Sequence, residues 1–204
     1  MANVSYKHVS KSNFQINTLH PSIREVVRDG IYYVNTNLLS NNAKVYVTDG
    51  YRTPEQQNAL LTSGRGVTRA GAMKSYHNYG LAFDVGLFVS DDSGAGRKYI
   101  KNTQVILEKD YDDDENPDFL ECVSYFRDML GFAWGGDWTG GFKDYPHFEV
   151  KVKLKALQDA YKSGYTFVDN NRKYVKLSYI MEQGYTVSLP HGADLNAENS
   201  IGNV

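Results

Sequence analysis

The spacing of apolar residues along the chain predicts a mixture of helices and strands. Apolar residues that recur every three or four positions indicate helices, whereas alternation of apolar and polar residues indicates strands. We therefore expect an α+β fold, with a single antiparallel sheet flanked by helices. The predicted helices begin near Pro21, Pro54, Pro117 and Leu154, and the predicted strands cover 43–48, 81–87, the surroundings of Trp134 and His147, 165–168 and 174–177.

Local signals define some ends of these elements and leave other segments open. Ser22 and Glu25 have the spacing of a capping box, which predicts that a helix opens there. Residues 1–19 show little periodicity, so we expect an arm or a short lead-in strand. Residues 99–107 are poorly defined by the same criterion.

The predicted strand from Leu81 carries one carboxylate. Alternate side chains of a strand face the same side, so Asp84 shares a face with Ala82 and Gly86. The opposite face is made of large apolar residues. Because small neighbours leave space around Asp84, this face is expected to form the floor of a cavity. His77 precedes the strand, where a loop can place its ring over the same cavity.

A second group of polar residues lies far downstream. His147 and Glu149 share one face of a short alternating run, and Asp144 stands three residues before His147. Pro146 restricts the backbone between Asp144 and His147. The pattern therefore offers a further histidine and a further carboxylate to the same cavity.

These residues fit a catalytic zinc site. Such a site has three protein ligands, an open position for water and a nearby acid/base that is not a ligand. His77, Asp84 and His147 fit the ligands, and Asp144 fits the acid/base. Two histidines and one carboxylate also bind non-haem iron, but there the first histidine and the carboxylate are usually separated by a single residue.

The motifs that contain these residues resemble those of the zinc peptidases of peptidoglycan. The chain reads SYHNYGLAFD over 75–84, WGGDW over 134–138 and DYPHFE over 144–149. The group includes L-alanyl-D-glutamate endopeptidases of phage endolysins and bacterial autolysins, and more distantly D-Ala-D-Ala peptidases. The resemblance covers about residues 20–152 and implies a fold like that of the D-Ala-D-Ala peptidases and the hedgehog signalling domain.

The resemblance also implies roles for individual residues. His77, Asp84 and His147 would hold one zinc ion, and Asp144 would be the general acid/base. The D-Ala-D-Ala enzymes usually carry Glu at the position of Asp144, so Asp favours the L-alanyl-D-glutamate branch. Arg52 precedes a helix start at Thr53-Pro54, and in the family an arginine there faces the bound peptide. A surface arginine is the alternative interpretation.

Two other functions stay open at this point. One is a D-Ala-D-Ala dipeptidase or carboxypeptidase, and the other is a non-catalytic, hedgehog-like zinc-binding module. The presence of both Arg52 and Asp144 argues against a site without activity.

Composition restricts the class and the expected location of the protein. The chain has 204 residues and a formal net charge of −2, which argues against a strongly basic nucleic-acid binder. Cys122 is the only cysteine, so an intrachain disulfide is excluded and a buried thiol is expected. No apolar run suits a signal peptide or a membrane span. We therefore expect a protein made in the host cytoplasm. The resemblance to phage endolysins implies that it acts on the cell wall or periplasm of a phage host and is released by a holin, and a monomer is expected.

Two segments lie outside the zinc motifs. The acidic run from Asp112 to Glu115 is interpreted as a solvated loop, with Ca²⁺ as an alternative and a spacing that differs from that of an EF-hand. The resemblance ends near residue 152, which predicts a catalytic domain over 1–152. Residues 153–204 would form a small C-terminal extension, either an extension of the sheet or a wall-binding appendage.

Overall fold

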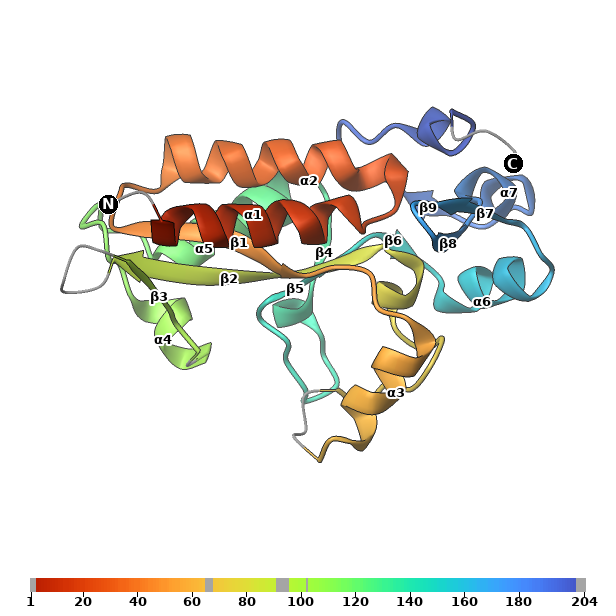
Figure 1. Ribbon diagram of the computed structural model, residues 1–204, viewed down its shortest axis with the longest axis horizontal. Helices are drawn as coiled ribbons and strands as arrows, with labels where there is room; N and C mark the ends of the chain where they lie inside the picture. Colours follow the sequence, from red (N-terminus) through yellow and green to blue (C-terminus); the bar gives the residue numbers. More distant parts are fainter. Residues whose placement is uncertain (1–2, 65–67, 91–95, 102, 201–204) are drawn as a thin grey trace.

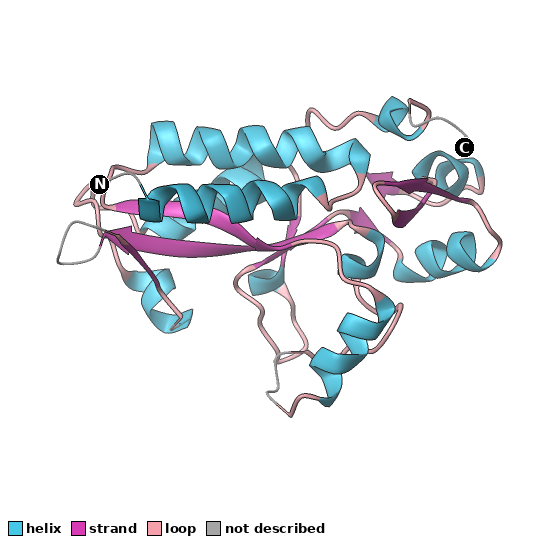
Figure 2. Ribbon diagram, viewed as in Figure 1, coloured by secondary structure: helices cyan, strands magenta, loops and turns pink. Residues whose placement is uncertain are grey.

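The computed structural model describes residues 3–64, 68–90, 96–101 and 103–200 (Figures 1 and 2). The α-helices are α1 (Asn3–Asn17), α2 (Pro21–Tyr33), α3 (Pro54–Thr62), α4 (Thr103–Glu108), α5 (Asp118–Val123), α6 (Leu154–Lys162) and α7 (Leu177–Glu182). The strands are β1 (Ala43–Asp49), β2 (Ala82–Ser90), β3 (Arg97–Tyr99), β4 (Ala133–Trp134), β5 (His147–Glu149), β6 (Lys151–Val152), β7 (Thr166–Asp169), β8 (Arg172–Val175) and β9 (Val187–Ser188). Short 3-10 or π turns are η1 (Val34–Leu38), η2 (Tyr76–Tyr79), η3 (Ser124–Met129), η4 (Gly135–Asp137) and η5 (Leu195–Glu198).

The central element is a five-stranded antiparallel sheet. Its strands follow the order β1-β2-β5-β4, and β3 pairs with the far end of β2. The α+β class expected from the sequence is confirmed. The prediction of a single sheet is wrong for the described residues, because β6 pairs with β9 and β7 pairs with β8 in two separate two-stranded sheets. These C-terminal strands have two to four residues each, and they pair only with one another.

The two faces of the central sheet have different surroundings. Helices α1 and α2 run side by side over one face, and α3 lies on the other side (Figure 1). Phe83, Val85 and Leu87 are fully buried in the hydrophobic core on the helix side. Since side chains alternate along β2, Asp84 points to the opposite face. The core therefore holds the strand while leaving the other face available for polar side chains.

The N-terminal segment forms a helix, so the expected arm or lead-in strand is wrong. From Lys7 to Asn17 only Ser12 and Ile16 are buried in α1. These two residues are four apart, which makes a buried stripe too narrow to produce a detectable apolar period. The Ser12 hydroxyl accepts a hydrogen bond from the Val47 amide at 3.0 Å and so fixes α1 to β1.

The start of α2 differs from the expected capping box. His20 is the N-cap, and its Nδ1 accepts a hydrogen bond from the Ser22 amide at 3.3 Å. Ser22 lies inside the helix, so it cannot act as the cap. Gly30 lies inside α2, where a Cβ would come within 2.8 Å of the Phe126 ring. Gly30 thus allows α2 to pack closely against η3.

Residues 153–200 contact the N-terminal part of the chain through buried groups. His20 Nε2 donates to the Val175 carbonyl at 3.0 Å, and the Tyr174 hydroxyl donates to the Thr18 carbonyl at 2.8 Å. The fully buried Leu177 belongs to the same core cluster as the central sheet. The division at residue 152 stays a prediction.

Two further expectations concern the burial of the cysteine and the length of the helices. Cys122 is buried and unpaired, as expected. Among the described residues, every helix is too short or too polar to cross a lipid bilayer.

Candidate metal centre

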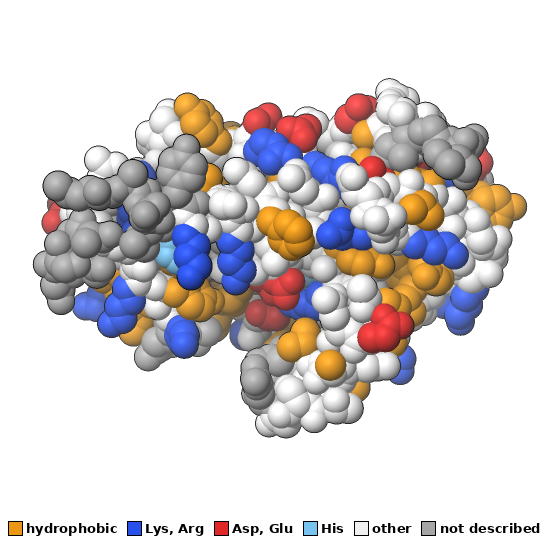
Figure 3. Space-filling view, in the orientation of Figure 1, with side chains coloured by type: hydrophobic (Ala, Val, Ile, Leu, Met, Phe, Trp, Pro, Cys, Tyr) orange, Lys and Arg blue, Asp and Glu red, His pale blue; other side chains and the backbone are white. Residues whose placement is uncertain are grey.

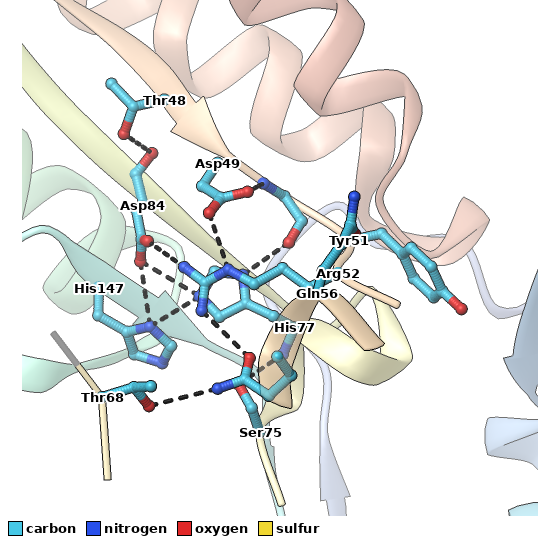
Figure 4. Close-up of polar contacts among 12 residues, drawn as sticks. Thr48, Asp49, Tyr51, Arg52, Gln56, Thr68, Ser75, His77, Asp84 and His147 are labelled. Carbon is cyan, nitrogen blue, oxygen red and sulfur yellow. Dashed lines mark hydrogen bonds and ion pairs between the residues drawn. The ribbon is translucent and has the colours of Figure 1, made fainter. Parts of the chain in front are cut away.

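Three acceptor atoms converge on the polar face of the central sheet. His77 Nε2, His147 Nδ1 and Asp84 Oδ1 are each 3.2 Å from the other two. Both histidines are buried, and Asp84 is partly accessible from the cavity. The structure therefore brings together the three residues that the sequence suggested as ligands (Figure 4).

Hydrogen bonds on the far side of each imidazole define its tautomer. His77 Nδ1 lies 2.6 Å from the Gly50 carbonyl, to which it can only donate. His147 Nε2 lies 2.9 Å from Glu149 Oε2, which likewise accepts a hydrogen bond from the ring. In the neutral rings, the lone pairs of His77 Nε2 and His147 Nδ1 therefore face Asp84. Partners of this kind are typical of metal-binding histidines.

The spacing of the three atoms fits a tetrahedral zinc ion. Ligand atoms about 2.0–2.1 Å from zinc at tetrahedral angles are about 3.3 Å apart, close to the 3.2 Å observed. Burial lowers the pKa of His147, but its bonds to Asp84 and Glu149 raise it to about 9. The two carboxylates therefore favour positive charge at this position, which a divalent cation can supply.

The sheet register explains why the ligands meet. Asp84 on β2 and His147 on β5 are directly opposite each other in the antiparallel ladder. Side chains at such a pair point to the same face and lie close together. The adjacent pair is Phe83 with Phe148, whose rings stack on the core side with centroids 5.5 Å apart. The aromatic core therefore holds the register that brings the ligands together.

His77 comes from a separate segment that is fixed to the end of β1. Ser75 caps η2 by accepting a hydrogen bond from the His77 amide at 3.4 Å. Gly80 follows with φ of 67°, and a Cβ there would come within 2.8 Å of the His20 amide nitrogen. The close passage of these two segments requires glycine. The hydrogen bond from His77 Nδ1 to the Gly50 carbonyl leaves Nε2 of the ring facing Asp84.

Arg52 lies beside the three candidate metal ligands and contacts two carboxylates. Its Nε donates to Asp49 Oδ2 at 2.7 Å, and its NH2 donates to Asp84 Oδ2 at 2.8 Å (Figure 4). Asp84 thereby presents Oδ2 to the guanidinium and Oδ1 to the two histidines. The Arg52 amide also donates to the His77 carbonyl at 3.0 Å. Arg52 consequently orients a ligand and connects the segments that carry the site.

Asp144 lines the same cavity and is positioned by a close backbone contact. Its amide donates to the Gly135 carbonyl at 3.2 Å, and a Cβ on Gly135 would lie 2.3 Å from the Asp144 carbonyl oxygen. Burial, and then the charge of Asp84, raise the pKa of Asp144 above its usual value. A carboxylate with a raised pKa is better suited to accept and return a proton.

The metal centre opens into a cavity of about 590 Å³ between the α3 region and the sheet. Figure 3 shows acidic and basic side chains meeting in the hollow where these parts join. One wall is aromatic: Trp138 lies against His147 with centroids 5.2 Å apart and stacks on Phe142. Arg69 lies over the Phe142 ring at 5.2 Å. The cavity can therefore accept an extended ligand with apolar and anionic groups.

Comparisons with known proteins agree with this geometry. A family model of peptidase family M15, described as D-alanyl-D-alanine carboxypeptidase, matches residues 68–150. The chain is 36% identical over 139 residues to the peptidoglycan L-alanyl-D-glutamate endopeptidase CwlK of Bacillus subtilis (strain 168), covering 65% of this chain and 73% of CwlK. The chain belongs to peptidase family M15. A second relative, the L-alanyl-D-glutamate peptidase of Listeria phage A118, is 32% identical over 114 residues, which are 56% of this chain and 33% of the phage protein.

Several residues that support the M15 site were missed in the sequence. Asp49 binds Arg52, and the Gly50 carbonyl orients His77. Gln57 is fully buried, and its side-chain amide donates to the Ala70 carbonyl at 2.9 Å, which fixes the loop beside the cavity. A backbone carbonyl has no sequence signal. The Asp49-Gly50 pair was visible only as a turn.

Proposed function

We propose that this protein is a zinc-dependent peptidase that hydrolyses the L-alanyl-D-glutamate bond in the stem peptides of bacterial peptidoglycan. The main support is the set of three acceptor atoms, each 3.2 Å from the others, with both imidazole N–H groups directed away from them. The names of the two M15 relatives support the substrate and the bond. Asp144, in the DYPHFE motif, favours the same branch.

His77, Asp84 and His147 would hold the zinc ion. When bound, zinc supplies a Lewis acid that polarises the scissile carbonyl and lowers the pKa of water toward neutrality. Glu149 and the Gly50 carbonyl keep both imidazoles in the tautomer that zinc requires. Their contribution is therefore orientation of the ligands rather than chemistry.

Asp144 would act as general base and then as general acid. It would accept a proton from the attacking water and deliver it to the amine that leaves when the peptide bond breaks. Its raised pKa supports both steps, because the carboxylate must hold the proton between them. Desolvation in the cavity is the main cause of that raised pKa.

Arg52 would have two roles. It holds Asp84 Oδ2, so that Oδ1 stays with the histidines. Its guanidinium also lines the cavity, where it would stabilise negative charge that develops on the scissile carbonyl. A guanidinium fork suits such a role because it presents several donors in fixed directions.

Digestion of purified sacculi tests the proposal. Mass spectrometry and end-group analysis should find new N-terminal glutamate on the stem peptides. Asp144→Asn should bind zinc normally but cleave about 10²–10⁴-fold more slowly, because the amide cannot accept a proton. An active Asp144→Asn variant would refute the mechanism.

The second candidate is a D-Ala-D-Ala carboxypeptidase or dipeptidase, which the description of the family model favours. Release of D-alanine or breakdown of D-Ala-D-Ala in the same assay would support it. Zinc binding without any cleavage would instead support a non-catalytic, hedgehog-like module. A monomeric state and release to the wall through a holin stay predictions.

A further inference from the structure

Five of the seven carboxylates in residues 110–121, which run from the loop after α4 into α5, lie at defined spacing. Counted from the first aspartate, they occupy positions 1, 3, 5, 9 and 12, and they are Asp110, Asp112, Asp114, Asp118 and Glu121. An EF-hand uses the side chains at these positions as calcium ligands, in a 12-residue loop between two helices. The expectation that the spacing differs from that of an EF-hand is therefore wrong. The consecutive acids at 112–115 hide the pattern, because only alternate members of the run belong to it.

The structure brings these carboxylates together. Oxygen atoms of Asp110, Asp112 and Asp118 lie within 4.8 Å of one another, and so do those of Asp112, Asp114 and Glu121. Asp112 belongs to both groups and joins them. The loop lies between two helices, since α4 ends at Glu108 and α5 begins at Asp118.

Three oxygens in this loop are buried without a hydrogen-bond partner. They are Asp112 Oδ1, Asp118 Oδ1 and Glu121 Oε2, half of the six such side-chain atoms among the described residues. The Asp118 side chain is fully buried. A buried carboxylate oxygen without a partner is costly, so three at one place indicate a missing ligand. They occupy positions 3, 9 and 12.

The remaining carboxylate oxygens organise the loop. Asp110 accepts hydrogen bonds from the amides of Asp112, Asp113 and Glu115 at 3.1, 2.7 and 2.8 Å. Asp118 Oδ2 accepts from the Tyr111 amide at 2.9 Å. An EF-hand has glycine at position 6 for a sharp turn. Here Glu115 occupies position 6 with φ of 75°, so the backbone follows that turn without the glycine.

Among the described residues, no side chain forms an ion pair with the cluster, although Lys44 interacts electrostatically with Asp112. The ion pairs among the described residues include none of the five carboxylates. The loop therefore holds charges that repel one another.

We propose that residues 110–121 form a calcium site of EF-hand type. Asp112, Asp118 and Glu121 supply the unpartnered oxygens. Calcium suits this loop better than magnesium, because Ca²⁺ takes six to eight oxygen ligands whereas Mg²⁺ usually keeps several waters. Asp112 Oδ2 also accepts from the Ser40 amide at 2.6 Å, which connects the loop to the turn before β1. Calcium would therefore strengthen the attachment of α5 to the sheet.

Calcium titration of the full chain, freed of calcium but loaded with zinc, tests the site. Isothermal calorimetry should find one Ca²⁺ per chain, and calcium should raise the melting temperature more than magnesium does. His77→Ala, which removes a proposed zinc ligand, should bind calcium with unchanged affinity. A calcium response that disappears in His77→Ala, or one no larger than that of magnesium, would overturn the proposal without affecting the zinc site.

Two matched variants separate ligation from general charge attraction. Asp112→Asn and Asp113→Asn remove the same charge from the same run, but Asp113 is exposed and occupies position 4, which holds no side-chain ligand. Asp112→Asn should weaken calcium binding at least about tenfold, and Asp113→Asn should weaken it less than about threefold. Equal losses in both variants would show diffuse attraction and overturn the site. Glu121→Gln at position 12 should reproduce the loss seen for Asp112→Asn.

Discussion

The buried histidine at the start of α2 makes the stability of the protein depend on pH. His20 is fully buried, and its two ring nitrogens have opposite roles: Nδ1 accepts from the Ser22 amide, and Nε2 donates to the Val175 carbonyl. Only the neutral ring can do both. Glu198 lies 3.7 Å away, and its oxygens accept hydrogen bonds from residues 177 and 178. It is too far to hold a proton on His20 by hydrogen bonding.

Burial is the main cause that lowers the pKa of His20 from 6.5 to about 4. Between these two pH values the unfolded chain then binds more protons than the folded chain. The contribution of His20 to the free energy of unfolding is therefore fully present above about pH 6.5 and is lost as the pH falls toward 4. Proton linkage over this interval lowers the free energy of unfolding by about 2 kcal/mol at about pH 5 and by about 3 kcal/mol at about pH 4.

Urea unfolding of the parent and of His20→Asn at about pH 7 and about pH 5 measures this contribution. Asparagine can still cap α2 by accepting from the Ser22 amide, but it does not titrate. The loss of unfolding free energy between the two pH values should be about 2 kcal/mol smaller in His20→Asn. Zinc release at low pH affects both proteins and cancels in the comparison. His191→Asn replaces an exposed histidine and should behave like the parent. An equal pH dependence of His20→Asn and the parent would refute the reasoning.

Two further predictions concern the catalytic site. Arg52→Ala should weaken zinc binding by about 10–100-fold, because Asp84 loses an orienting partner. The variant should also cleave sacculi more slowly than the parent at saturating zinc. Full turnover at saturating zinc would restrict the role of Arg52 to metal retention. Gly135→Ala should lower turnover while the fold is retained by circular dichroism, because the added Cβ would lie 2.3 Å from the Asp144 carbonyl oxygen. The control is Gly140→Ala, because a Cβ at Gly140 meets no atom within 4 Å. Its activity should stay near that of the parent. Equal activity of both variants would contradict the positioning of Asp144 by Gly135.

The sequence by itself predicted much of the candidate zinc site. The alternation around Asp84 and the His147–Glu149 pair are local properties of strands, so the polar face could be predicted from side-chain spacing alone. The calcium-type spacing of residues 110–121 is equally local, but the consecutive acids made it resemble a solvated run. Burial of Asp118, which only the tertiary structure reveals, distinguishes the two interpretations.

Only the tertiary structure decided the partners of these residues. The tautomer of His77 depends on the carbonyl of Gly50, and every residue has a carbonyl, so no residue type predicts that contact. Gly135 lets the Asp144 backbone pass at close range, a contact that no property of the glycine itself predicts. Between Lys7 and Asn17, helix α1 has a two-residue buried stripe that became recognisable only against β1. Residue type and spacing carry information along one element, whereas contacts between distant elements depend on how the whole core packs.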